Sequence, residues 1–141
     1  MRPRALLLLW LSLWFCLIGP AGASARPILK AVEPVVIFGS QQQYKFKARI
    51  DTGATLSSID SRLAQRLGLD QQPLREILVQ NAHGTTRRRV IKVKYILKGQ
   101  LRESDFTLIS RQDLPYPILL GRRSLTGFLV DPSEPESTKQ P

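Results

Sequence analysis

One short segment, Ile50-Asp51-Thr52-Gly53-Ala54-Thr55, constrains this chain more than any other part of it. It follows residues 44–50, where apolar and polar side chains alternate as they do in a strand with one buried face. The carboxylate of Asp51 is followed at once by a hydroxyl and a glycine, which favour a tight turn. Asp51 therefore either stabilises the turn or is a reactive carboxylate at the end of the strand.

Short strands account for most of the remaining sequence, and helix for little of it. Residues 62–67 are predicted to form a two-turn helix that Asp60 or Ser61 caps and Gly68 ends, and residues 122–125 a single turn. Apolar or alternating runs predict further strands at residues 27–29, 35–38, 56–59, 77–79, 90–97, 101–109, 118–120 and 128–130. Short strands at such even spacing imply an all-β domain, either a small barrel or a sandwich.

The N-terminus has the pattern of an export signal. Two arginines precede an apolar run over residues 5–18, and small residues at the spacing that signal peptidase requires follow it. We therefore predict a signal peptide over residues 1–23, with cleavage after Ala23 or Ala25. An uncleaved signal that anchors the protein in the membrane is the alternative, although the run is short for a membrane span.

The two remaining parts of the chain differ in composition. Residues 24–131 hold the predicted strands and form the predicted folded domain. Residues 132–141 contain three prolines and no apolar side chain that could anchor them, so we expect a disordered tail.

Charge and cysteine content bear on the compartment and the partners. The sole cysteine, Cys16, lies in the export signal, and export without disulfides fits a bacterial periplasm.

The net charge of +10 favours anionic surfaces or substrates. Residues 87–89 with Lys92, Lys94 and Lys98 form either the solvated face of a strand or a site for an anionic polymer. Export and the lack of interleaved aromatic residues other than Tyr95 argue against nucleic acid.

If Asp51 is catalytic, the chain supplies only half of a site. Hydrolysis of an amide by paired carboxylates needs two aspartates close enough to share a proton. No other aspartate begins a second Asp-Thr-Gly or Asp-Ser-Gly segment. An enzyme of this type must therefore be a symmetric homodimer that brings Asp51 of each subunit to the two-fold axis.

Two further segments give the chain a family resemblance. Tyr116-Pro117-Ile118-Leu119-Leu120-Gly121-Arg122-Arg123-Ser124-Leu125 and the closing Phe128-Leu129-Val130-Asp131 accompany Asp51-Thr52-Gly53-Ala54. With them the sequence resembles the retropepsin-like aspartic peptidases, and more closely the bacterial group often labelled "ATP-dependent zinc protease". The resemblance spans roughly residues 31–132. It implies a small closed β-barrel and the homodimeric cleavage of protein or peptide substrates in extended conformation.

The resemblance also implies roles for individual residues. Asp51 would be the catalytic aspartate, and Thr52, Gly53 and Ala54 would form the active-site loop around it. A hairpin over residues 79–86 would be the flap that covers the substrate. The supporting motif would comprise Leu119, Leu120, Gly121 and Arg122. The flap tip would comprise Asn81, His83 and Gly84.

Thr55 departs from the family pattern, because many retroviral relatives have an acidic residue there that pairs with the arginine after the companion glycine. Arg122 must find another partner, and Asp60 or Asp131 is expected.

The zinc label receives no support from the sequence. His83 is the sole histidine, no His-Glu-x-x-His is present, and no phosphate-binding loop supports ATP. We therefore expect no metal and no cofactor. The alternative to an enzyme is a non-catalytic periplasmic β-barrel module that binds an anionic envelope polymer or an acidic protein.

Overall fold

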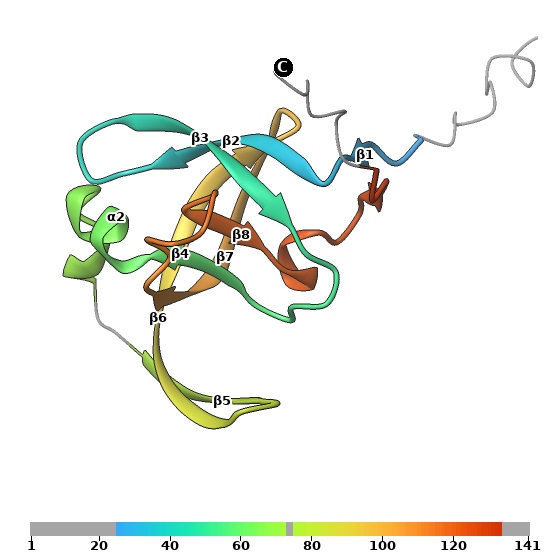
Figure 1. Ribbon diagram of the computed structural model, residues 1–141. Helices are drawn as coiled ribbons and strands as arrows, with labels where there is room; N and C mark the ends of the chain where they lie inside the picture. The colour runs from blue at the N-terminus through green and yellow to red at the C-terminus, as the bar shows by residue number, and fades with distance from the viewer. Residues whose placement is uncertain (1–24, 73–74, 134–141) are drawn as a thin grey trace, which may run out of the picture.

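A closed β-barrel forms the body of the protein (Figure 1). The computed structural model describes residues 25–72 and 75–133. Antiparallel pairing of residues 35–37 with residues 95–97 closes the barrel. In order around it, the strands are β2 (Val32–Phe38), β3 (Gln43–Ile50), β8 (Ile118–Leu120), β4 (Ser57–Asp60), β7 (Gln100–Ile109) and β6 (Gly84–Leu97). The expected all-β class and closed barrel are confirmed.

Alternating side chains fill this barrel as the sequence predicts. In β3, Ala48 and Ile50 are buried, whereas Lys45 and Lys47 are exposed. Each large apolar side chain that is buried contributes about 1.5–3 kcal/mol. The largest fully buried side chains are Tyr95, Phe106, Leu29, Ile37, Ile59, Ile91, Leu97, Ile118 and Leu120.

Two features of the hairpins follow from local backbone chemistry. Lys98 and Gly99, which join β6 to β7, both have positive φ, 49° and 75°, as a two-residue hairpin turn with the right twist requires. Strand β2 is longer than predicted and contains Pro34 in its interior. Pro34 is tolerated because β2 pairs with β6 only at residues 35–37, so Pro34 has a neighbour on one side only.

The predicted helix is present as α2 (Ser61–Arg66), and Asp60 is its N-cap. Leu63 and Ala64 face the core. Gly68 has the left-handed conformation expected after the helix, with φ 67°. A short 3-10 helix that the sequence did not predict, η2 (Leu69–Gln71), follows it.

Strand β5 (Arg75–Asn81) pairs only with the first half of β6. The resulting hairpin, hereafter the β5–β6 hairpin, extends away from the barrel (Figure 1). Its outer face carries Leu78, which is 70% exposed. The hairpin predicted at residues 79–86 is therefore confirmed as a projecting element.

The two ends of the described chain lie together (Figure 1). Strand β1 (Ile28–Leu29) pairs in parallel with β9 (Leu129–Val130) to form a separate two-stranded sheet. The predicted signal peptide and most of the predicted tail lie outside the described residues. None of the helices within residues 25–72 and 75–133 is long and apolar enough to cross a membrane.

Candidate active site

Strand pairing brings the Asp51 loop and the companion motif together. Strand β3 runs parallel to β8, with Ile50 opposite Leu120. The residues that follow, Asp51 and Gly121, therefore leave the sheet side by side. Asp51 donates its backbone N–H to the carbonyl of Leu120 at 3.0 Å, which fixes the start of the loop.

The loop curls around the carboxylate of Asp51. Its Oδ1 accepts hydrogen bonds from the backbone N–H groups of Gly53 at 2.8 Å and Ala54 at 3.3 Å. Its Oδ2 has no hydrogen-bond partner among the described residues. One oxygen is thus held by the loop, and the other is available to a second group.

Gly121 allows the companion motif to approach this loop. A Cβ atom at Gly121 would lie 2.5 Å from the carbonyl oxygen of Leu56 and 2.9 Å from that of Ala54, so only glycine fits. The Gly121 N–H donates to Ser57 Oγ at 3.1 Å, and the Arg122 N–H donates to the carbonyl of Ala54 at 2.9 Å. These contacts hold the loop against β8 from both sides.

Arg122 begins η3 (Arg122–Ser124), the predicted single helical turn, and braces the loop with its side chain. Its Nη1 donates to the carbonyls of Thr52 and Gly53, each at 3.0 Å, and its Nη2 donates to Thr55 Oγ1 at 2.8 Å. The expected partnership with Asp60 or Asp131 is wrong. Thr55 supplies a neutral oxygen to the same guanidinium.

Asp60 caps α2, as predicted, and does not pair with Arg122. Its Oδ1 accepts from the N–H groups of Arg62 and Leu63, and its Oδ2 accepts from the N–H of Arg111 at 2.8 Å. Burial opposes ionisation, but these three donors, Arg111 foremost, outweigh it and hold the pKa of Asp60 below its ordinary value. Asp60 therefore ties α2 to the segment after β7 as a buried carboxylate.

A cleft of about 320 Å³ lies between the Asp51 loop and the β5–β6 hairpin. Gly53 and Ala54 line it from the loop side, while Val79, Gln80 and Arg88 line it from the hairpin. The remaining side chains that line it are Thr55, Leu56, Ser58, Thr107, Ile109, Arg111 and Leu119. The cleft is bounded by two different elements, between which an extended ligand could lie.

The predicted site residues separate into those at the cleft and those elsewhere. Gly53, Ala54 and Leu119 line the cleft, whereas Leu120 is buried in the barrel. The predicted flap residues Asn81, His83 and Gly84 lie at the tip of the β5–β6 hairpin. Among the described residues, no group of three or more His, Cys, Asp or Glu side chains could hold a metal ion.

Sequence reasoning missed two arginines of the cleft, Arg88 and Arg111. Arg88 had no clear signal, because its face of the strand holds buried Val90 but also exposed Lys92 and Lys94. Arg111 lies in a loop after β7 and had none.

Comparisons with known proteins agree with this geometry. A family model described as "gag-polyprotein putative aspartyl protease" matches residues 39–126. A search of curated protein sequences finds no match.

Several solved structures share the fold. A Legionella pneumophila protein of unknown function, Lpg0085 (DUF785), is 22% identical, with 82% of this chain and 100% of that chain covered and a TM-score of 0.54. The foamy viral protease–reverse transcriptase in complex with an RNA/DNA hybrid is 18% identical over 73% of this chain and 12% of that chain, with a TM-score of 0.54. The prototype foamy virus protease–reverse transcriptase is 21% identical over 74% and 12% of the respective chains, with a TM-score of 0.51.

At these identities the structural likeness establishes the fold, and the family model establishes the kinship. The chain belongs to the retropepsin-like aspartic peptidase family.

Proposed function

We propose that this protein is an aspartic endopeptidase that acts as a homodimer and hydrolyses peptide bonds in extended protein segments. The observation that carries the proposal is the state of Asp51. One of its oxygens is held by two backbone N–H groups and the other lacks a partner among the described residues, beside a cleft. Two such carboxylates that share a proton would activate a water and protonate the scissile carbonyl.

The dimer follows from the number of carboxylates. The chain has one Asp-Thr-Gly segment, so the second carboxylate must come from a second copy. The β1–β9 sheet supports an association of this kind. Within residues 25–72 and 75–133 it has only two strands, and Ile28 and Leu129 are 57% and 49% exposed there. Such a small sheet is marginal alone and gains stability when further strands or apolar groups cover it.

The cleft supports an extended substrate. An extended peptide between the Asp51 loop and the β5–β6 hairpin could add strand-like hydrogen bonds to the hairpin edge. The hairpin would then close over the peptide as a flap and exclude water from the reacting bond.

The export pattern extends the proposal to the compartment. We infer removal of residues 1–23 and a periplasmic location for the domain over residues 24–131. A retained signal would instead tether the same domain to the membrane.

An Asp51→Asn substitution tests the proposed chemistry. The change preserves shape but removes the proton that the pair must share, so cleavage of an unfolded protein substrate should fall by roughly a thousandfold. Asp113→Asn, at an exposed position, is the matched control and should retain activity. Unchanged cleavage by the Asp51→Asn protein would refute the proposed role of Asp51, whereas a native protein that binds but does not cleave would favour the non-catalytic module.

Mixing the two proteins tests the homodimer in the same assay. Excess Asp51→Asn subunits should inhibit the native protein, because mixed dimers hold only one native carboxylate. Sedimentation should show dimers of both proteins. A strictly monomeric, active native protein would contradict the shared site.

A further inference from the structure

We propose that Arg88 and Arg111 select a substrate with an acidic side chain, which they bind as a carboxylate within the cleft. This inference rests on the proposed function and names the substrate class of the same site. It makes the cleft a subsite for Asp or Glu beside the scissile bond.

The environment of Arg111 is the main support. The residue is only 8% exposed, although it carries a full positive charge. Its Nε donates to the carbonyl of Tyr116 at 2.9 Å, and its Nη1 donates to Ser58 Oγ at 3.2 Å. Both partners are neutral, and Nη2 has no hydrogen-bond partner in the described part of the chain. A donor of this buried guanidinium is therefore left for a ligand.

No carboxylate among the described residues forms an ion pair with this guanidinium. Asp60 is near, but its oxygens accept from backbone N–H groups instead. Burial lowers the pKa of Arg111. The negative charges of Asp51 and Asp60, neither of which forms an ion pair with Arg111, oppose that effect. Because a buried charge without a close counter-charge is costly, a carboxylate that entered the cleft would bind there favourably.

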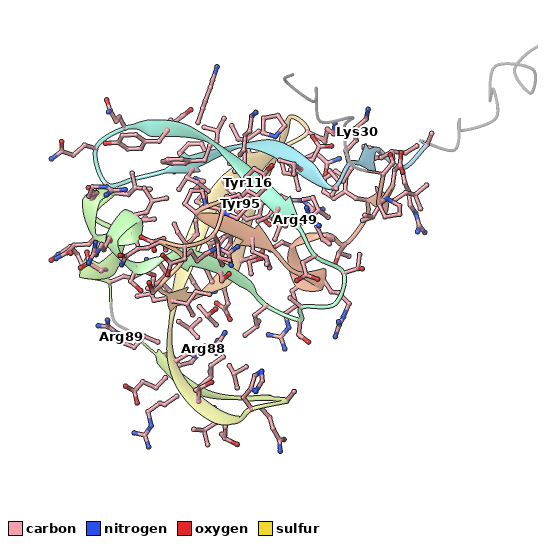
Figure 2. The ribbon with its side chains drawn as sticks, viewed as in Figure 1. Lys30, Arg49, Arg88, Arg89, Tyr95 and Tyr116 are labelled. Atoms are coloured by element: carbon pink, nitrogen blue, oxygen red, sulfur yellow. The ribbon has the colours of Figure 1, made fainter. Side chains whose placement is uncertain are left out.

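Arg88 adds a second cation from the opposite wall. It lies across from Ile77 in the β5–β6 hairpin, on the same face as Val79, and lines the cleft with it. Figure 2 shows Arg88 on the side of the hairpin nearer the barrel. Its neighbour Arg87 has the opposite parity and pairs with Glu76 away from the cleft. The hairpin therefore presents one particular arginine to the cleft.

The charged side chains that line the cleft are all positive. The lining contains two arginines from separate elements and, among the described residues, no Asp or Glu. Guanidinium groups bind carboxylates through paired, charge-assisted hydrogen bonds, whereas a neutral amide of the same shape binds less strongly. Discrimination between Glu and Gln is thus the property that this cleft should confer.

Cleavage of matched peptides tests the inference. A set of C-terminally amidated peptides would carry Glu, Gln or Lys at each position in turn, so that only a side chain can supply the carboxylate. At one position, Glu should raise kcat/KM over Gln by about tenfold. Arg88→Gln and Arg111→Gln should each reduce that ratio, while Arg87→Gln, on the other face of the hairpin, should keep it.

Two measurements keep the result decisive. Arg88 lies on the projecting hairpin, so Arg88→Gln tests the inference even where Arg111→Gln fails to fold. Binding of the Glu and Gln peptides to the Asp51→Asn protein separates recognition from catalysis. Preferential binding of Glu peptides with no cleavage by the native protein would support this subsite and refute the proposed peptidase. Equal handling of Glu and Gln, or a preference that survives the Arg88 and Arg111 substitutions, would overturn the inference.

Discussion

The Asp51 loop and the β5–β6 hairpin enclose the same cleft but are held in opposite ways. The loop is fixed by contacts with other elements. Gly121 packs against Leu56, Arg122 donates to the loop carbonyls at the surface, and a buried 2.6 Å hydrogen bond joins Ser57 to Ser124 behind the loop. The hairpin projects from the barrel, and its side chains are mostly exposed. One wall of the cleft is therefore anchored in the core, whereas the other is anchored mainly by its own strand pairing.

This difference suits the proposed division of labour. Groups that act on a reacting bond gain from a geometry set in advance, which the loop provides through contacts with β8 and η3. A covering element must open and close, and few buried contacts lower the cost of such motion. Substitutions in the contacts around the Asp51 loop should therefore destabilise the protein strongly, and substitutions in the β5–β6 hairpin should destabilise it little.

Gly121→Ala should have the largest effect. The added methyl would meet the backbone of Leu56 and Ala54, which cannot yield without displacing the loop. The loss in the free energy of unfolding should be about 3 kcal/mol or more, measured by urea denaturation. Gly84→Ala is the matched control, because its new methyl meets nothing within 4 Å and only its φ of 117° opposes the change. That control should lose about 1 kcal/mol. Equal losses would show that the two walls are supported alike.

Asp60→Ala should come next, at about 2–3 kcal/mol, because it removes the cap of α2 and leaves the N–H of Arg111 unpaired. The acid dependence of stability gives a second readout. Because the pKa of Asp60 is lower in the folded state, its contribution is complete above the ordinary pKa of 3.8 and is lost as the pH falls below it.

The control for this pH effect is Asp60→Asn, which cannot titrate. Its stability difference from the native protein, followed by thermal unfolding, should be constant above about pH 4 and shrink below it. A difference that grows on acidification would contradict a lowered pKa.

The smallest effect is expected for Glu76→Gln in the hairpin. Glu76 pairs with Arg87 at 3.3 Å, and both side chains are more than half exposed, so the pair should contribute about 0.5 kcal/mol or less. A double-mutant cycle with Arg87→Gln would measure that coupling. Coupling as large as the Asp60→Ala loss would mean that the hairpin is as firmly held as the loop.

Local patterns predicted much of the fold. The alternation over residues 44–50 identified β3 and its buried face, because side chains of a strand point to opposite sides with a period of two. The Asp60 cap and the left-handed Gly68 were also predictable, since both depend on backbone geometry within one helix end. Strand ends were less predictable: β5 begins at Arg75, two residues before its predicted start.

Contacts between distant segments were not predictable in the same way. The position of Asp51 at the end of a strand and the presence of a companion glycine could be identified in the sequence. The partners of Arg122 could not, because the choice between a carboxylate and the loop carbonyls depends on how β8 packs against that loop.

The sequence by itself determined the carboxylate, its tight turn, the single copy of that turn and the all-β class, since each depends on neighbouring residues or on composition. Only the tertiary structure decided that the barrel closes through β2 and β6 and that Gly121 touches Leu56. It alone also buried Arg111 in the cleft without a carboxylate partner among the described residues. Burial and proximity across the chain arise from packing, which no local pattern encodes.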